Sequence, residues 1–356
     1  MTELLSNIIG MIKPLDREAM ADAKLRQDML TKPQGSLGRL EELSVQLAGI
    51  QGKPVPQVKH KAIVTMAGDH GVVAEGVSAF PQEVTAQMVY NFLTGGAGIN
   101  VITRQVGARI IVVDMGVATN LKSNPQLLSR KVASGTQNMS RGPAMTKEQA
   151  VKAIETGIEL VTSEVAKGLD IVGTGDMGIG NTTASSAICA VITGKPVSEV
   201  TGRGTGVVDE QLAHKVEVIN KALAVNRPDP AQPLDVLAKV GGFEIGGLVG
   251  VMLAAAAHRI PVVIDGFISG AAALIATALS PELNSFLIAA HVSAEVGHRL
   301  LLRHLELKPL LDLKMRLGEG TGAALGISLA EIAARVLAEM STFTEAGVAE
   351  REEIDN

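Results

Sequence analysis

The chain has 356 residues, of which 46% are hydrophobic and 19% charged, with a formal net charge of −5. These values are typical of a globular protein with one large core, or with one core and a smaller domain. Only 2% of the residues are aromatic, and there is no tryptophan. The chain lacks both the positive charge that binds a phosphate backbone and the stacking surfaces that bind single strands, so nucleic acid is excluded as the expected partner.

Cysteine content and hydropathy indicate the compartment. The single cysteine, Cys189, excludes an intramolecular disulfide and fits a reducing environment. The first residues, MTELLSNIIG, lack the basic segment of a secretion signal. The longest uncharged run, 266–280, is shorter than the roughly 20 residues that span a bilayer, and we predict a buried helix there. The expectation is a cytoplasmic protein with no membrane partner.

Helices are the first elements predicted in chain order. Residues 15–50 are predicted to form helices interrupted by KPQGSLGRLEEL (32–43). The second helix carries an apolar row on one face, formed by Leu40, Leu43, Leu47 and Ile50.

Short apolar runs then alternate with helical patterns. Runs of Val and Ile without polar alternation indicate strands covered on both faces, as in a parallel sheet. The predicted strands are 62–68, 109–116, 169–176, 260–266 and 285–291, with a weaker one at 131–136. Between them, Thr146 and Gln149 form a capping-box pattern at the start of an amphipathic helix that Gly168 is placed to end. This alternation predicts an α/β fold with a doubly wound, Rossmann-like parallel sheet core.

The last predicted helix covers 322–343. Its apolar side chains recur at helical spacing at Leu325, Leu329, Ile332, Val336 and Met340. Both ends of the chain therefore lack strands. We predict a small helical domain formed by the two termini, 1–60 and 322–356, beside a Rossmann-like α/β catalytic domain, 61–321.

Several predicted strands end in an acid beside a glycine, namely Asp69, Asp114, Asp176 and Asp265. Ligands of open parallel sheets bind at the carboxyl ends of the strands, so these residues predict the active edge. Asp and Gly also favour any turn after a strand, so one such pair alone is weak evidence. His70 and His291 close two strands and either contact ligand or are satisfied within the core.

The strongest local signal is VGTGDMGIGNTTASS (172–186), in which a predicted strand enters a glycine-rich loop and then a helix. Glycines let the backbone approach a ligand, and the free N–H groups of the first helical turn bind an anion. An ordinary helix cap needs fewer glycines. We therefore predict a phosphate site at this helix start.

Two features leave alternatives open. Gly173, Gly175 and Gly178 match G-x-G-x-x-G, so an NAD-dependent dehydrogenase is an alternative, although the acid at the expected spacing, Glu199, lies in a predicted loop. A second glycine cluster, TGRGTG (201–206), precedes a helix that carries Lys215. This lysine either neutralises a phosphate or is simply solvated.

Eight blocks occur in order along 14–345: KPQGSLGRLEEL, AGDHGV, FPQEVTAQMV, GDMGIGNTTA, KVGGFEIGGLVGVMLAAA, DGFISGAAAL, HVSAEVGH and RLGEGTGAAL. Together they closely resemble the nicotinate-nucleotide:dimethylbenzimidazole phosphoribosyltransferase (CobT) family. The resemblance implies transfer of phosphoribose from nicotinate mononucleotide to 5,6-dimethylbenzimidazole. The products are α-ribazole 5′-phosphate, which serves cobalamin nucleotide-loop assembly, and nicotinate. It also implies a homodimer with no metal or other cofactor. A non-catalytic nucleotide- or benzimidazole-binding protein is a further alternative.

The resemblance also implies roles for residues. In RLGEGTGAAL the family's general base corresponds to Glu319, which could otherwise only stabilise the following helix through its dipole. Asp176 is a candidate second carboxylate, although many relatives carry glutamate there. The implied phosphate and ribose contacts are Gly178, Gly180, Asn181, Thr182, Thr183, Gly204, Lys215 and Ser293. The implied base pocket is Phe80, Met88, Met177, Leu317, Gly318 and Gly320, with the alternative that the first four are ordinary core residues.

Overall fold

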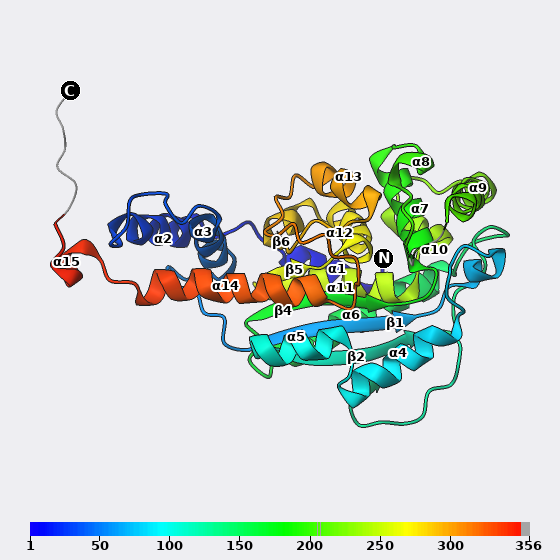
Figure 1. The fold of residues 1–356 in the computed structure, drawn as a ribbon, viewed down its shortest axis with the longest axis horizontal. Coiled ribbons are helices and arrows are strands. Elements are labelled where there is room, and N and C mark those ends of the chain that lie inside the picture. The colour runs from blue at the N-terminus through cyan, green and yellow to red at the C-terminus, as the bar shows by residue number, and fades with distance from the viewer. Residues whose placement is uncertain (205, 207, 350–356) are drawn as a thin grey trace.

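A six-stranded parallel sheet forms the centre of the molecule in this computed structural model, which describes residues 1–204, 206 and 208–349 (Figure 1). The strands are β1 (Lys61–Gly68), β2 (Arg109–Gly116), β3 (Leu127–Ser129), β4 (Ile171–Met177), β5 (Val262–Ile264) and β6 (Leu287–Ala289). Their order is β3-β2-β1-β4-β5-β6, and every paired register is parallel. The chain reverses its direction across the sheet between β1 and β4, so the predicted doubly wound fold is confirmed.

Helices cover both faces of the sheet. One face packs against α4 (Glu83–Thr94), α5 (Gly98–Val106) and α14 (Thr321–Glu339). The other packs against α6 (Lys147–Val165), α11 (Phe243–Ala257) and α12 (Phe267–Leu279). Because successive strand residues face opposite sides, Val64 and Met66 enter the second core while Ile63 and Ala67 enter the first. This double burial explains why the strands are continuously apolar.

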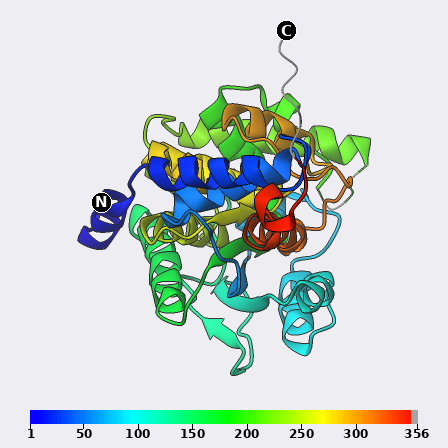
Figure 2. The same ribbon diagram turned by 90° about the vertical axis from the view of Figure 1, so that its left-hand side faces the viewer.

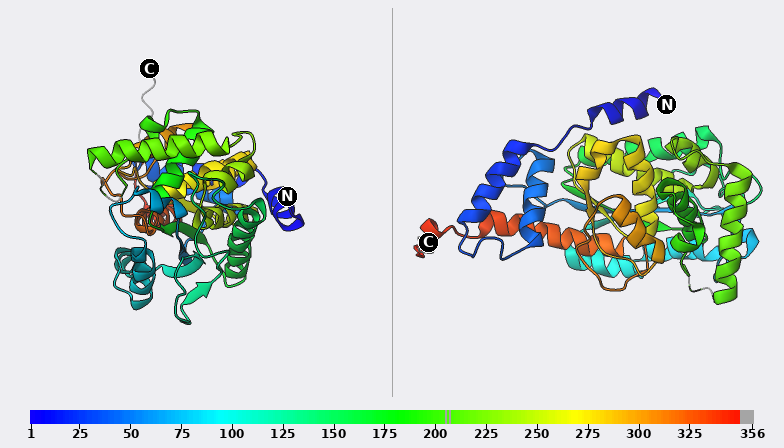
Figure 3. Two further views of the ribbon diagram at one scale, coloured as in Figure 1. Left: turned by 90° about the vertical axis from the view of Figure 1, so that its right-hand side faces the viewer. Right: turned by 90° about the horizontal axis from the view of Figure 1, so that it is seen from above.

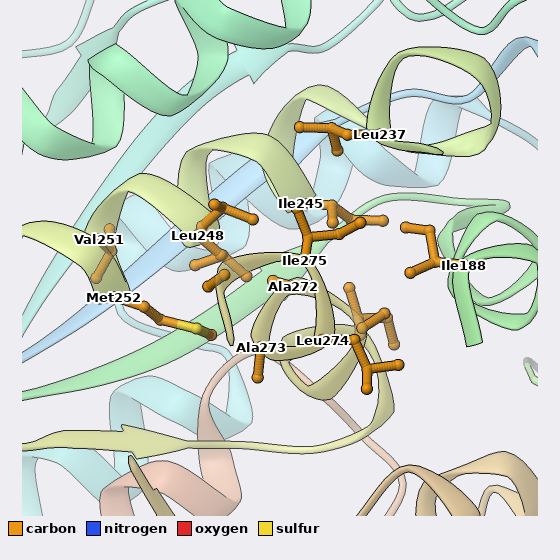
Figure 4. Packing of buried hydrophobic residues seen from close by; sticks show 14 of the residues in the cluster. Ile188, Leu237, Ile245, Leu248, Val251, Met252, Ala272, Ala273, Leu274 and Ile275 are labelled. Carbon is orange, nitrogen blue, oxygen red and sulfur yellow. The ribbon is translucent and has the colours of Figure 1, made fainter. Parts of the chain in front are cut away.

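The larger core lies between α11, α12 and their neighbours. Leu248 and Met252 of α11 and Ile275 of α12 belong to one apolar cluster (Figure 4), and all three are fully buried. The buried helix predicted at 266–280 is therefore confirmed as α12. Shorter elements complete this side of the molecule: η1 (Gly71–Glu75), α7 (Asn181–Thr193), α8 (Val197–Val200), α9 (Asp209–Asn226), α10 (Pro233–Val240), η2 (Pro281–Phe286) and α13 (Val296–His304).

Helices from both termini pack together at one end of the molecule. α2 (Arg17–Met29) and α3 (Arg39–Gln51) contact α14, where Ala23, Ala48 and Leu337 form a small apolar cluster. The right-hand view of Figure 3 shows these helices beside the sheet domain. α1 (Glu3–Met11) instead lies along the flank of the molecule (Figure 2) and contacts α6 and α11. α15 (Phe343–Ala346) follows α14. The division at residues 60 and 322 stays a prediction, and its tail from residue 350 lies outside the described residues.

Two details differ from the sequence predictions. The weak strand expected at 131–136 is wrong, because the edge strand that pairs with β2 is Leu127–Ser129, and the chain then turns through Gly135 at φ +79°. The apolar row that predicted α14 is not its most buried row, since Ile332 is 44% exposed. The buried row is instead mainly alanine: Ala323, Ile327, Ala330, Ala334 and Leu337.

The predicted capping box is present at the start of α6, where Thr146 accepts a hydrogen bond from the Gln149 N–H. α6 ends at Val165, and Gly168 lies in the turn that follows, at φ +90°. Among the described residues, α14 is the one helix long and apolar enough to cross a membrane by length and composition, and 56% of its apolar window is buried inside the protein.

Candidate active site

A cavity of about 470 Å³ lies at the carboxyl edge of the sheet, where β4, β5 and β6 end. Its wall is formed by the segments that follow these strands, together with Phe80 and the Arg316–Gly318 segment. The lining residues are Phe80, Asp176, Met177, Gly178, Ile179, Asn181, Thr182, Gly204, Gly266, Phe267, Ile268, His291, Ser293, Glu295, Arg316, Leu317 and Gly318. This is the edge that the strand-end aspartates predict.

One end of the cavity has the groups of an anion site. The loop after β4 passes through Gly180 at φ +91° and opens α7, whose first-turn residues Asn181 and Thr182 line the cavity. The N–H groups of Asn181 and Thr183 donate within the turn, to the Gly178 and Gly180 carbonyls. The fully buried Lys215 of α9 donates hydrogen bonds to Thr182 Oγ1 at 2.8 Å and to the Gly202 carbonyl at 3.4 Å. Burial lowers the pKa of Lys215 to about 8, against the opposing charge of Glu295.

The segment after β6 supplies a second wall at this end. Ser293 lies on the cavity, and its Oγ accepts a hydrogen bond from the Glu295 N–H at 3.3 Å. His298 Nδ1 accepts a hydrogen bond from the Ser293 N–H at 2.8 Å. Burial lowers the pKa of His298 to about 3, so the ring is neutral and suited to accept this bond. Hydrogen bonds with Glu295 and His298 therefore hold Ser293 in place.

The RLGEG segment holds Glu319 in an unusual backbone conformation. Its φ is +64°, in the left-handed region that glutamate rarely adopts. The Thr65 hydroxyl donates to the Glu319 carbonyl at 2.9 Å, and the Glu319 N–H donates to the Asp176 carbonyl at 3.2 Å. The side chain is buried and its Oε2 accepts a hydrogen bond from the Ile99 N–H of α5 at 3.1 Å. Burial raises the pKa of Glu319, and this hydrogen bond opposes the rise.

Two further carboxyl groups lie close to Glu319. Burial, followed by the charges of Asp265 and Glu244, raises the pKa of Asp176 well above its ordinary value. Burial also raises the pKa of Asp265 to about 7, although that carboxylate accepts hydrogen bonds from the N–H groups of Gly320 and Ala323. Asp265 thus caps α14 directly after Glu319 and fixes the direction of the segment that carries it.

A buried pair lies beneath the loop after β4. His70 Nε2 is 2.6 Å from Glu244 Oε1, and both side chains are fully buried. Burial lowers the pKa of His70, but the charges of Glu244 and Asp69 outweigh it, so the net shift is upward. His70 therefore contacts Glu244 within the core, whereas His291 lines the cavity.

Most of the predicted contacts meet at this one cavity. Of the phosphate and ribose set, its wall contains Gly178, Asn181, Thr182, Gly204 and Ser293. Lys215 lies directly behind Thr182, whereas the Thr183 hydroxyl is buried without a hydrogen-bond partner among the described residues. Gly180 is the N-cap of α7 and packs against His70. In the second glycine cluster, Thr205 lies outside the described residues.

Only some of the residues predicted for the base pocket line the cavity. Phe80, Met177, Leu317 and Gly318 line the cavity, and Gly320 is the N-cap of α14. Met88 is half-buried on α4, among the residues that pack against the sheet. Asp176 lines the cavity, whereas Glu319 is not among the lining residues: it follows the lining residues Leu317 and Gly318, and its carboxylate accepts the hydrogen bond from the first turn of α5.

Sequence reasoning did not predict several lining residues: Ile179, Gly266, Phe267, Ile268, Glu295 and Arg316. Their position in the sequence could have predicted them, because most of them follow a strand that ends at this edge of the sheet. The dinucleotide fingerprint is wrong for a structural reason. Gly173 and Gly175 lie inside β4, and a Cβ on Gly175 would approach the Glu319 carbonyl oxygen to 2.3 Å. These glycines allow α14 to start against the strand.

A parallel α/β fold with a ligand-sized cavity at the carboxyl edge of its sheet is typical of nucleotide-binding enzymes. A family model described as "Phosphoribosyltransferase" matches residues 12–348. The chain is 60% identical over 348 residues to the nicotinate-nucleotide–dimethylbenzimidazole phosphoribosyltransferase of Desulforudis audaxviator, covering 98% of this chain and 99% of that one. It is 63% identical over 345 residues to the same-named protein of a Roseiflexus species, covering 97% and 98%.

Solved structures agree with these relatives. The crystal structure of this phosphoribosyltransferase from Thermus thermophilus matches with a TM-score of 0.90 and 47% identity, over 95% of this chain and 100% of that one. The chain therefore belongs to the nicotinate-nucleotide–dimethylbenzimidazole phosphoribosyltransferase family.

Proposed function

We propose that the protein transfers phosphoribose from nicotinate mononucleotide to 5,6-dimethylbenzimidazole, giving α-ribazole 5′-phosphate and nicotinate for cobalamin nucleotide-loop assembly. The names of its relatives supply the substrates. The observation that carries the proposal is that one cavity joins a phosphate-type site, at α7 and Lys215, to an apolar wall beside an acid.

The chemistry asks little of the protein. The bond from the sugar's anomeric carbon to the pyridinium nitrogen breaks, and its electron pair neutralises that ring, so no strong general acid is needed. One imidazole nitrogen of the benzimidazole forms the new bond to the same carbon. The proton on its other nitrogen must then leave, and a carboxylate within hydrogen-bond reach accepts it. Direct attack inverts the anomeric carbon and converts the β-nucleotide into the α-product.

Glu319 has the properties that this base requires. Its Oε2 is held by the Ile99 N–H, while Oε1 has no hydrogen-bond partner among the described residues. Burial raises its pKa, which makes the carboxylate a better proton acceptor than an exposed one. Flanking residues Leu317 and Gly318 line the cavity, so a flat ring against this wall would lie next to the acid.

The direct test is incubation of the purified protein with nicotinate mononucleotide and dimethylbenzimidazole, with and without a metal chelator. Chromatography would score nicotinate and α-ribazole 5′-phosphate in equal amounts. Formation of both in the presence of chelator is the expected result. Binding of both compounds without any product would instead favour a non-catalytic binding protein.

We also propose that the protein forms a homodimer through the exposed apolar face of α5 and α14. Val101 of α5 is 55% exposed and Ile332 of α14 is 44% exposed, and these two helices pack against each other. A second copy of the chain would remove this surface from water. Light scattering of the purified protein should give twice the chain mass, and Val101→Asp together with Ile332→Asp should give the monomer. A monomeric wild type contradicts the proposal.

A further inference from the structure

Glu295 places a carboxylate at the end of the cavity that we assign to phosphate. The residue is only 7% exposed, yet it forms part of the cavity wall with Ser293 and Gly204. Its Oε2 is buried and has no hydrogen-bond partner among the described residues. This oxygen packs against Gly202, where an added Cβ would lie 2.1 Å from it.

An acid is out of place in an anion site. Its charge repels a phosphate group that Lys215 and Thr182 would attract. The charge of Glu295 favours the charged form of the buried Lys215, but the ammonium bonds directly to Thr182 Oγ1 and the Gly202 carbonyl, and within the described part of the chain no ion pair joins it to Glu295. A buried carboxylate without donors is also unfavourable. Because Glu295 lines the cavity, a ligand bound there can supply a donor to this carboxylate.

The ligand provides donors of the right kind. A nucleotide held by its phosphate has its sugar a short distance further along the cavity, and each ribose hydroxyl carries a proton to donate. We propose that Glu295 accepts a hydrogen bond from a ribose hydroxyl of the nucleotide and so selects ribose over deoxyribose. The inference deepens the function proposed above and rests on it. It adds a residue that the predicted phosphate and ribose set did not contain.

Steady-state turnover with three donors tests this role: nicotinate mononucleotide and its 2′-deoxy and 3′-deoxy analogues, each with dimethylbenzimidazole. A charged hydrogen bond of this kind corresponds to about 10- to 100-fold in kcat/KM. For the wild type we expect one deoxy analogue to lose this factor. Glu295→Gln should lose a similar factor with the full ribose and should lose little or nothing more with that same analogue, because the two changes remove one interaction.

The matched control is Glu282→Gln, an exposed acid in η2, which precedes β6 and so lies away from the carboxyl edge of the sheet. It should leave all three values unchanged. Inhibition by inorganic phosphate should persist in Glu295→Gln, which shows that the phosphate site is intact. If Glu295→Gln does not fold, Glu295→Asp replaces it, because aspartate keeps the charge but is shorter by one methylene. Its kcat/KM is then measured with the same three donors.

Two results would overturn the inference. An equal loss with all three donors means that Glu295 supports the structure without contacting a hydroxyl, and no loss with any donor means that it does not contact the sugar. Neither result touches the proposed reaction. Failure of the wild type to use nicotinate mononucleotide would instead refute that reaction itself.

Discussion

Glu319 Oε2 accepts a hydrogen bond from the Ile99 N–H at 3.1 Å, although 220 positions separate the two residues in the chain. The contact ties the proposed base to the positive end of α5. It fixes the carboxylate beside the cavity and leaves its second oxygen for a substrate.

Replacing this acid tests its role as the base. Glu319→Gln keeps the shape of the side chain but cannot accept a proton at neutral pH. We expect kcat to fall by about 10²- to 10⁴-fold, as for other general bases, with an unchanged melting temperature. Nicotinate release and circular dichroism measure the two quantities. Near-full turnover in a folded variant would remove Glu319 from the mechanism.

The lowered pKa of Lys215 predicts a pH dependence of nucleotide binding. Because its folded pKa is about 8, the side chain is charged below that pH and loses its proton as the pH rises through it. The substrate phosphate is fully ionised by then. Binding of nicotinate mononucleotide should therefore weaken above pH 8. Calorimetry from pH 7 to 9.5 measures this, and Lys215→Met should bind weakly at every pH without the transition.

The same shift predicts an effect on stability. The unfolded lysine has a pKa of 10.5, so between about pH 8 and pH 10.5 the unfolded chain binds more protons at this position than the folded chain. Stability contributed by Lys215 must therefore rise with pH across this window. Urea unfolding at pH 7 and pH 10 measures this effect. Between the two pH values, the free energy of unfolding of the wild type should rise relative to that of Lys215→Met.

Gly175 is predicted to be essential for the start of α14. An alanine Cβ there would lie 2.3 Å from the Glu319 carbonyl oxygen, so backbone atoms must move. Gly175→Ala should lower the free energy of unfolding by about 1–3 kcal/mol and should also reduce turnover. Gly10→Ala is the control, because nothing lies within 4 Å of its added Cβ. Equal stability of the two variants would contradict this account of the glycine.

The base pocket separates two predicted residues. Phe80 lines the cavity, whereas Met88 packs among the residues beside the sheet. Phe80→Ala should raise the KM for dimethylbenzimidazole several-fold with little change in the KM for the nucleotide, because the lost contact is apolar. Met88→Ala should change the first KM less and the melting temperature more. The reverse pattern would place Met88, and not Phe80, against the base.

Local signals predicted most of this fold. The sequence predicts the strands because both faces of the sheet are covered, which makes the strands continuously apolar. It predicts the start of α7 because the chain needs a left-handed backbone there, which Gly180 provides. The edge strand β3 was missed because only Leu127 and Leu128 mark it. The most buried row of α14 is mainly alanine, which gives a weaker hydropathy signal than its half-exposed leucines.

The site contains contacts between residues that are distant in the sequence, and no local sequence pattern predicts these contacts. His70 and Glu244 are 174 positions apart, and only the sheet topology brings them together. Glu295 was missed because an acid just before a helix is ordinary in sequence and becomes unusual only beside Lys215. Glu319 was predicted only through the family resemblance, because motif blocks in a fixed order identify residues that meet in the fold although they are distant in the sequence.

α14 begins two residues after Glu319, and its far end lies under α2 and α3. A helix of 19 residues is about 28 Å long and resists compression along its axis. α14 therefore connects the packing of the terminal helices to the segment that carries the proposed base. We accordingly expect that tags or fusions attached near the terminal helices would alter the turnover of the proposed reaction.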